Sequence, residues 1–141
     1  MPRWKYDPNV RRGRHVVHHL HAHLVFVTKY RKAVFTDAVL TTCQQSMESV
    51  CEDFGATLSE FNGEADHVHL LVQYPPAVRL SDLVNSLKGV SSRIIRRDHP
   101  NQLADLLWGK NLWSPSYFAA SAGGAPLDIV KQYISNQQRP S

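Results

Sequence analysis

The chain has 141 residues, 43% of them hydrophobic, which suits one compact domain over residues 1–141 with an apolar core of its own. No apolar run approaches the ~18 residues that a membrane span needs, and the first residues lack the apolar centre of a signal peptide, so we expect a cytoplasmic protein without a membrane partner. The net charge is +4, and residues 1–32 hold eight Lys or Arg against the single acid Asp7. This basic arm, residues 1–14 with Arg14 at its end, suits a nucleic-acid backbone, but a solvated, frayed terminus is an equally good interpretation.

The first predicted strand covers residues 15–28. Period-two alternation divides it into an apolar face and a face that begins with histidines: Leu20, Ala22, Leu24 and Phe26 against His19, His21, His23, Val25 and Val27. Five His fall within nine residues, but a cluster that is only compositional predicts metal binding weakly. We therefore expect most of these imidazoles to be hydrogen-bonded or to lie on the sheet surface.

A helix is predicted after Thr36, whose side chain can cap it, and before Gly55, which can end it. Its apolar positions repeat at intervals of three and four, which is typical of one buried helix face: Leu40, Cys43, Met47, Val50, Cys51 and Phe54. The two cysteines are eight residues apart, which suits neither a zinc knuckle nor a redox pair, so we expect reduced core thiols. A short strand over residues 56–62 follows.

Residues 66–72, Asp-His-Val-His-Leu-Leu-Val, are predicted to form a buried third strand. Alternation sets His67 and His69 side by side on one face and turns the apolar residues into the core: Val68, Leu70 and Val72. Two imidazoles on a rigid strand can share one divalent cation, although the same pattern also arises by chance as a half-exposed surface pair. Glu64 and Asp66 are weaker candidates for ligands, because turns are commonly acidic.

A longer helix is predicted for residues 80–97, after Pro75-Pro76 ends the third strand. Its apolar residues define the buried side: Leu80, Leu83, Val84, Leu87 and Ile94. Elsewhere on the helix, an acid-free polar stripe consists of Asn85, Lys88, Ser92 and Arg96. Arg93 lies near it. A solvated helix face is the ordinary interpretation, but the lack of any acid favours contact with a DNA backbone. Gly89 costs the helix ~1 kcal/mol relative to Ala, so we expect another backbone or a ligand to approach it.

Residues 103–108 are predicted as a short helix and residues 117–121 as the last strand. The aromatic residues around them can stack on bases, but aromatics beside a strand usually pack in the core: Trp108, Trp113, Tyr117 and Phe118. Gly123-Gly124 then provides a flexible tether to the last helix.

The last predicted helix covers residues 126–139, with Pro126 at its first position and Asp128 in its first turn. Tyr133 and Gln137 are four residues apart and project from one face, where a phenol and an amide oxygen can meet the same metal-bound phosphate. A tyrosine packed in the core with its hydroxyl at the rim is the alternative.

Together these stretches resemble the single-tyrosine HUH transposases of the smallest bacterial insertion sequences, to which the REP-associated tyrosine transposases are close. The similarity runs nearly end to end and rests on several motifs in the right order: His-Leu-Val-Phe-Val-Thr-Lys-Tyr-Arg (23–31), Asp-His-Val-His-Leu-Leu (66–71), Leu-Lys-Gly (87–89), Leu-Trp (107–108), Leu-Trp-Ser-Pro-Ser-Tyr (112–117) and Tyr-Ile-Ser-Asn-Gln (133–137). Ala22 stands where the family often has Tyr.

The resemblance implies an α+β, ferredoxin-like (RRM-like) fold: an antiparallel sheet with helices on one face, plus a C-terminal helix that carries the catalytic tyrosine. In such a sheet the first and third strands are neighbours, so His23 is expected near His67 and His69, either supporting a metal ligand or contacting phosphate.

The resemblance also implies an activity. The expected protein is a homodimer with composite active sites, which binds hairpins in single-stranded DNA at element ends and cuts and rejoins strands through a 5′-phosphotyrosine. Tyr133 is then the nucleophile, and Mg²⁺ or Mn²⁺ is held by His67, His69 and the amide oxygen of Gln137. No carboxylate is placed clearly enough to name as a general base.

Three alternatives stand beside this interpretation. A domesticated relative that processes repeated palindromes would keep the same site. A replication-initiator or relaxase nuclease shares the HUH logic, but Gln137 and the short chain argue against it. A non-catalytic RNA-binding module of ferredoxin-like fold would use aromatic residues of the sheet and need no metal.

Overall fold

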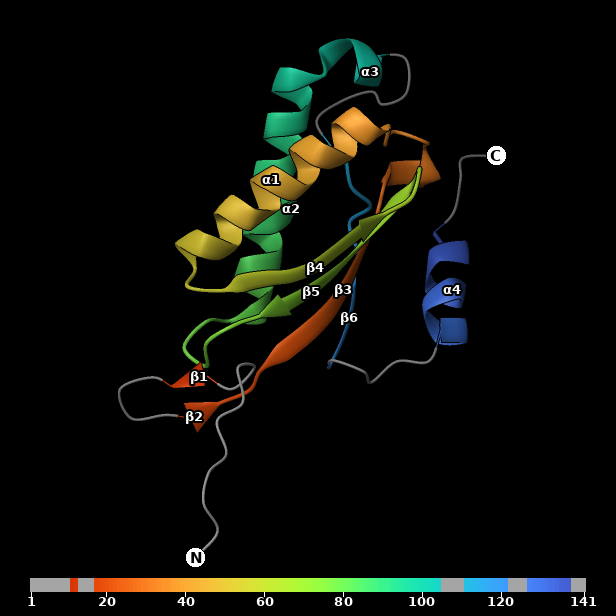
Figure 1. Ribbon diagram of the computed structural model, residues 1–141. Coiled ribbons are helices and arrows are strands. Elements are labelled where there is room, and N and C mark those ends of the chain that lie inside the picture. Colours follow the sequence, from red (N-terminus) through yellow and green to blue (C-terminus); the bar gives the residue numbers. More distant parts are fainter. Residues whose placement is uncertain (1–10, 13–16, 105–110, 122–126, 138–141) are drawn as a thin grey trace, which may run out of the picture.

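Four antiparallel strands form the central sheet of the computed structural model, which describes residues 11–12, 17–104, 111–121 and 127–137 (Figure 1). The strands are β3 (His21–Val27), β4 (Thr57–Gly63), β5 (His67–Gln73) and β6 (Phe118–Ser121), in the order β4-β5-β3-β6. Helix α1 (Asp37–Asp53) connects β3 to β4, and helix α2 (Leu80–Asp98) lies between β5 and β6 in the chain. This order and connection are those of a ferredoxin-like fold, so the predicted fold class is confirmed.

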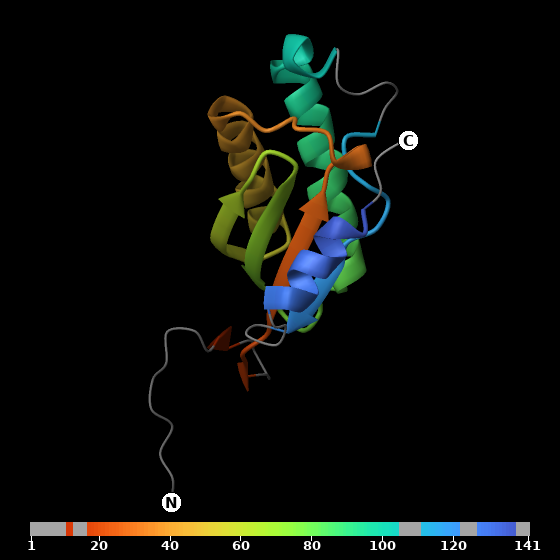
Figure 2. The same ribbon diagram turned by 90° about the vertical axis from the view of Figure 1, so that its right-hand side faces the viewer.

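Helices cover both faces of the sheet. Helices α1 and α2 pack on one face, and the short helix α4 (Leu127–Ser135) lies against the other (Figure 1, Figure 2). Leu24 and Phe26 of β3 belong to the main core under α1 and α2, whereas Val25 and Val27 form a second, smaller cluster with α4. The histidine-bearing face of β3 is therefore buried over its last part, which alternation alone did not predict.

The ends of α1 follow the sequence signals. Thr36 is the N-cap, and its Oγ1 accepts a hydrogen bond of 3.3 Å from the backbone N–H of Val39. Gly55 follows the helix with φ +70°, a left-handed conformation that glycine adopts without strain. Cys43 and Cys51 are both free and buried, as predicted.

The first strand is shorter than predicted. Instead of one strand over residues 15–28, the described residues form β3 and a separate two-residue strand β2 (Val17–His18), which pairs with β1 (Arg11–Arg12). His21, the first residue of β3, lies opposite Gln73, the last residue of β5. The N–H of Tyr74 still donates to the carbonyl of Leu20 over 3.0 Å, but Pro75-Pro76 follows and has no N–H to donate, so the pairing of the two strands ends there. The predicted basic arm, with Arg14, lies almost wholly outside the described residues.

The buried side of α2 agrees with the prediction at Leu83, Val84 and Leu87 and differs toward both ends of the helix. Ile95, not Ile94, is fully buried, and Leu80 is only partly buried. The buried row includes a polar residue: Leu83, Val84, Leu87, Ser91 and Ile95. Ser91 fits there because its hydroxyl accepts a hydrogen bond of 3.0 Å from the indole N–H of Trp113.

The remaining elements agree with the sequence in type and differ at their ends. The helix predicted for residues 103–108 is α3 (Pro100–Ala104), which begins at Pro100, a residue well suited to the first helical position. Trp108, Gly123-Gly124 and Pro126 lie outside the described residues. In the part of the chain that the structure describes, no helix is long and apolar enough to span a membrane.

Candidate active site

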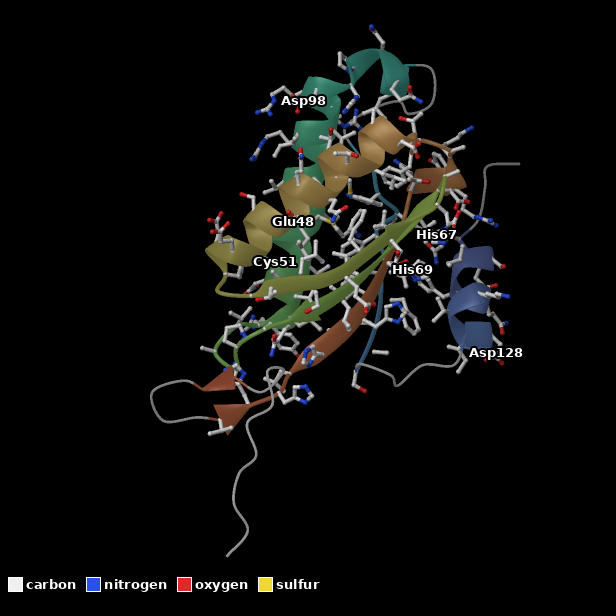
Figure 3. The ribbon with its side chains drawn as sticks, viewed as in Figure 1. Glu48, Cys51, His67, His69, Asp98 and Asp128 are labelled. Carbon is white, nitrogen blue, oxygen red and sulfur yellow. The ribbon has the colours of Figure 1, made fainter. Side chains whose placement is uncertain are left out.

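His67 and His69 lie side by side on the face of the sheet that α4 covers (Figure 3). Their ring centroids are 5.0 Å apart and the rings are nearly perpendicular. In the strand register, His67 is opposite Val27 and His69 is opposite Val25. Since directly opposite residues share a face, the two histidines point to the side where these valines pack against α4. Both side chains are half-buried.

Asp66 fixes the ring of His67. Its carboxylate accepts a hydrogen bond of 2.7 Å from Nδ1 of His67 and one of 3.2 Å from Nε of Arg31. Burial acts to raise the pKa of Asp66, but the hydrogen bonds from His67 and Arg31 outweigh it and leave the pKa below its usual range. Asp66 is thus an ionised partner of His67, which holds Nδ1 protonated and leaves Nε2 to bind a ligand.

His23 supports His69 in the same manner. Its Nε2 lies 3.3 Å from Nδ1 of His69, and the two rings are stacked with centroids 5.5 Å apart. Burial lowers the pKa of His69, and the nearby His67 and His23 lower it further. A neutral imidazole is the form that binds a metal ion. The predicted position of His23 beside the pair is confirmed, and when His69 donates from Nδ1 to His23 its Nε2 is free to bind a ligand.

A strained turn brings Arg31 to this site. Tyr30 and Arg31 both have left-handed backbone conformations, with φ of 59° and 55°. Such residues cost about 1–3 kcal/mol each, and they concentrate at functional sites. Thr28 anchors the turn, because its N–H donates to the carbonyl of Asp66 over 2.9 Å. Sequence reasoning missed Arg31; its signal was only its place in the Thr-Lys-Tyr-Arg motif.

Tyr133 is in the last turn of α4, and Gln137 lies two residues beyond the helix, which ends at Ser135 and not at residue 139 as predicted. Both contact a segment that carries Ser114 and Ser116. The hydroxyl of Tyr133 is 2.8 Å from Oγ of Ser116. Oε1 of Gln137 accepts hydrogen bonds from Ser114 over 2.7 Å and from Ser116 over 3.2 Å. A serine hydroxyl has one hydrogen, so when Ser116 donates to Gln137 the phenol donates to Ser116.

Packing holds the tyrosine ring. Tyr133 contacts Phe118 with ring centroids 5.7 Å apart and joins the small cluster built around three buried residues: Val25, Val27 and Val130. Burial raises the pKa of the phenol, and the hydrogen bond with Ser116 acts in the opposite direction. The ring is therefore packed with its hydroxyl at the rim, as the alternative interpretation expects, and the role of Tyr133 as nucleophile stays a prediction.

The segment that carries the two serines, Leu112 to Ser116, is tied to the fold from two sides. On the sheet side, Ser114 N–H donates to the carbonyl of Val27 over 2.8 Å, and Lys29 N–H donates to Leu112 over 2.9 Å. On the helix side, Lys88 donates from Nζ to the carbonyls of Ser114 and Ser116. The Leu-Trp-Ser-Pro-Ser-Tyr motif was the one feature of the sequence that pointed to these contacts.

A basic groove of about 590 Å³ opens between α2 and this segment. No acidic residue of the described chain lines it, and Lys29 does. Four of the residues predicted to contact DNA also line it: Lys88, Ser92, Arg93 and Arg96. Asn85 does not line it. Gly89 does, but no other group of the described chain comes within 4 Å of where its Cβ would lie. The prediction of a close backbone at Gly89 is wrong, and a ligand there stays a prediction.

The donor atoms fit a metal ion in part. Among the described residues, no three His, Cys, Asp or Glu side chains converge on one point. Two histidine nitrogens and an amide oxygen are nevertheless a reasonable donor set for a divalent ion whose other positions go to water or phosphate. His67 and His69 fit directly. The amide oxygen of Gln137 already accepts from two serine hydroxyls, and its role as a third ligand stays a prediction.

Comparisons with known proteins show the family of the chain. The family model described as IS200-like transposase matches residues 16–137. The ISDra2 transposase TnpA of Deinococcus radiodurans is 32% identical over 128 residues, which are 91% of each chain. The transposase for insertion sequence element IS200 of Salmonella typhimurium is 28% identical over 118 residues, 82% of this chain and 74% of that one.

Two solved structures are also similar. A crystal structure from Deinococcus radiodurans, of a protein described as a transposase, has a TM-score of 0.81 and 31% identity, covering 92% of this chain and 99% of that chain. A REP-associated tyrosine transposase bound to a REP hairpin has a TM-score of 0.54 at 10% identity, covering 94% of this chain and 68% of that one. This second likeness concerns the fold alone.

Proposed function

The chain belongs to the IS200-like transposase family, and we propose that it cuts and rejoins single-stranded DNA with Tyr133 as the nucleophile. One observation carries the proposal. Helix α4, which bears Tyr133 and ends two residues before Gln137, packs on the same sheet face that presents His67 and His69. This shared face supports a site in which a phenol and a pair of imidazoles act together.

The proposed chemistry is a transesterification. The phenolic oxygen of Tyr133 attacks the scissile phosphorus and forms a 5′-phosphotyrosine, while the 3′ oxygen leaves and takes up a proton. A free 3′-hydroxyl can then attack the phosphotyrosine and release the tyrosine, which reseals a strand without ATP because the number of phosphoester bonds is conserved. Mg²⁺ or Mn²⁺ at His67, His69 and Gln137 would supply Lewis-acid activation of the phosphate.

The surrounding residues prepare the site before DNA arrives. Asp66 and His23 contact the Nδ1 atoms of His67 and His69, which would leave the Nε2 atoms to bind a metal ion. Ser116 holds the hydroxyl of Tyr133. Fixed partners of this kind lower the reorganisation that the reaction needs, which is a general source of rate enhancement. His23 thus acts by supporting His69 and is a weaker candidate for a direct phosphate contact.

The substrate is proposed to be DNA that carries hairpins at element ends. The basic groove supports this, because Ser92, Arg93 and Arg96 line it together with Lys29. Within the described chain, Nε and Nη2 of Arg96 are buried without a hydrogen-bond partner, and a guanidinium so placed favours an anion nearby. Arg14, outside the described residues, stays a predicted contact.

The RNA-binding alternative is disfavoured by the covered sheet. Such a module stacks bases on aromatic residues of an open sheet face. Here Phe118, an aromatic residue on that face, packs against Tyr133, and α4 lies over the strands (Figure 2). We therefore propose an enzyme and not a passive binding module.

The test uses single-stranded oligonucleotides that carry the palindromes found in the DNA flanking the gene. With Mg²⁺ or Mn²⁺, the wild-type protein should form a covalent DNA adduct that is seen as a shifted band in denaturing gels. His67→Ala should abolish the adduct and leave hairpin binding nearly intact, and Tyr133→Phe should do the same. His19→Ala, which removes an exposed histidine, is the matched control. Hairpin binding with no adduct in the wild type would refute the enzyme.

A further inference from the structure

We propose that Lys88 is a positioning residue for the reaction: its ammonium holds the backbone of Ser114 and Ser116, and these two serines in turn hold Tyr133 and Gln137. The inference rests on the proposed function of Tyr133. It assigns to Lys88 a task inside the protein, where the acid-free stripe of α2 had predicted a contact with the DNA backbone.

The ammonium group of Lys88 contacts backbone carbonyl groups of the protein itself. Nζ donates to the carbonyl oxygen of Ser114 over 2.7 Å and to that of Ser116 over 3.1 Å. The side chain is half-buried and passes the ring of Tyr117, with Nζ 6.0 Å from the ring centroid. An ammonium has three donors, so two are used on these carbonyls. Burial of the amine lowers its pKa, and the carbonyl oxygens compensate for part of its lost hydration.

The side chains of Ser114 and Ser116 in turn hold Tyr133 and Gln137 by hydrogen bonds. Ser116 bonds the hydroxyl of Tyr133 over 2.8 Å, and both serines donate to Oε1 of Gln137. Their side chains can do this only while the backbone that carries them stays in place. Ser114 is also tied to β3 through its N–H, whereas Lys88 is the side chain that reaches the carbonyl of Ser116. Loss of Lys88 should therefore affect Ser116 and Tyr133 most.

The expected effect is on the chemical step. A displacement of about 1 Å in a reacting group lowers rates by up to about a hundredfold, so Lys88→Met should slow adduct formation roughly ten- to a hundredfold at saturating DNA. Methionine keeps most of the stem and removes the charge. A phosphate contact would behave differently, because its loss would weaken DNA binding and lower the salt slope by about one unit.

The experiment compares Lys88→Met, Ser116→Ala and the double variant by single-turnover adduct formation at saturating hairpin DNA. Arg97→Met, an exposed cation on the same helix that pairs with Asp98, is the control and should match the wild type. Because Lys88 is proposed to act through Ser116, the double variant should be little slower than the worse single variant. Affinity for DNA and its salt slope should stay at the wild-type values in Lys88→Met.

Several results would overturn the inference. A normal adduct rate at saturating DNA with a salt slope smaller by about one unit would make Lys88 a phosphate contact. Single-variant effects that multiply would show that Lys88 and Ser116 act independently. Hydrogen exchange gives a readout that does not depend on catalysis, because Lys88→Met should speed exchange in residues 112–117 and 127–137. If the wild-type protein forms no adduct, the proposed function fails. Unchanged hydrogen exchange in Lys88→Met would separately refute the proposal that Lys88 holds the backbone of Ser114 and Ser116.

If Lys88→Met does not fold, Ser116→Ala is the second variant. It removes one partly exposed hydroxyl, and it should slow adduct formation while leaving DNA affinity unchanged. A wild-type rate of adduct formation in Ser116→Ala would show that Lys88 does not act on Tyr133 through Ser116, which would refute the inference.

Discussion

Removal of the Asp66 carboxylate should weaken metal binding without removing any proposed ligand. In Asp66→Ala, His67 loses the acceptor that fixes its ring, and Arg31 loses its partner. A hydrogen bond to a charged group contributes about 1.5–3 kcal/mol, and each 1.4 kcal/mol corresponds to about a tenfold change in affinity. Partners of this kind in known metal sites are worth about 10–100-fold. We therefore expect the half-saturating Mn²⁺ concentration to rise by about 10–100-fold.

The assay is single-turnover adduct formation titrated with Mn²⁺. Asp66→Ala should approach the wild-type rate at saturating ion, because Tyr133 and its contacts are unchanged. Asp98→Asn is the matched control, since Asp98 also pairs with an arginine but is exposed at the far end of α2 (Figure 3). An unchanged half-saturating concentration in Asp66→Ala would refute the orienting role. A rate that no amount of Mn²⁺ restores would point instead to a direct catalytic task.

The pH dependence of this contact follows from the direction of the pKa shift. The pKa of Asp66 is held below its usual range in the folded protein. The stabilising contact is thus fully present above the pKa of an unfolded Asp, about 3.9, and is lost only as pH falls through the lower folded value. Protonation of Asp66 should therefore contribute nothing to the pH dependence of metal binding above about pH 4.

Two further predictions concern the groove and the cysteines. Arg93→Ala combined with Arg96→Ala should lower the salt slope of hairpin binding, measured by fluorescence anisotropy, by about two units. An unchanged slope would show that neither side chain contacts a DNA phosphate. Burial raises the pKa of the Cys51 thiol to about 11, and it raises that of Cys43 further. Neither thiol should react with a disulfide reagent at pH 8 until denaturant unfolds the protein, so a fast-reacting thiol in the native state would contradict the buried positions.

The parts of the site that the sequence predicted are those set by local geometry. Alternation along one strand is enough to place His67 and His69 together, because their spacing does not depend on any other element. The cap at Thr36 and the stop at Gly55 are likewise decided within a few residues. The helix predicted over residues 126–139 is shorter, because α4 ends at Ser135 and Gln137 lies beyond it, although both Tyr133 and Gln137 contact Ser116.

The parts that the sequence did not predict depend on residues far apart in the chain. The bond from Arg31 to Asp66 spans 35 positions, and those from Lys88 to Ser114 and Ser116 span 26 and 28. No periodicity carries such information. The prediction of the buried side of α2 missed Ser91 for a related reason: Ser91 looks like a surface residue until its partner Trp113 is known. A strand face that starts with histidines looked half-exposed until α4 was seen to cover it.

The origin of the two halves of the site can be tested by mixing variants. The family resemblance implies that the tyrosine helix of one subunit serves the histidines of another. The described chain seats α4 on its own sheet, but the contact is small: a nine-residue helix with Val130 as its buried anchor, in a cluster separate from the main core. Burying one valine contributes only about 1.5–3 kcal/mol, and an exchanged helix would make the same contacts on a partner. Exchange between subunits is therefore energetically accessible.

We expect Tyr133→Phe and His67→Ala, each inactive alone, to recover cleavage when they are unfolded, mixed and refolded together. Random pairing makes half of the dimers mixed, and each mixed dimer has one intact site of two, so about a quarter of the wild-type sites should return. The adduct should then form only on the His67→Ala subunit, which retains the tyrosine, and a size tag on one subunit would show this. No recovery, with mixed dimers demonstrated by the tag, would mean that each chain uses its own helix as the described structure seats it.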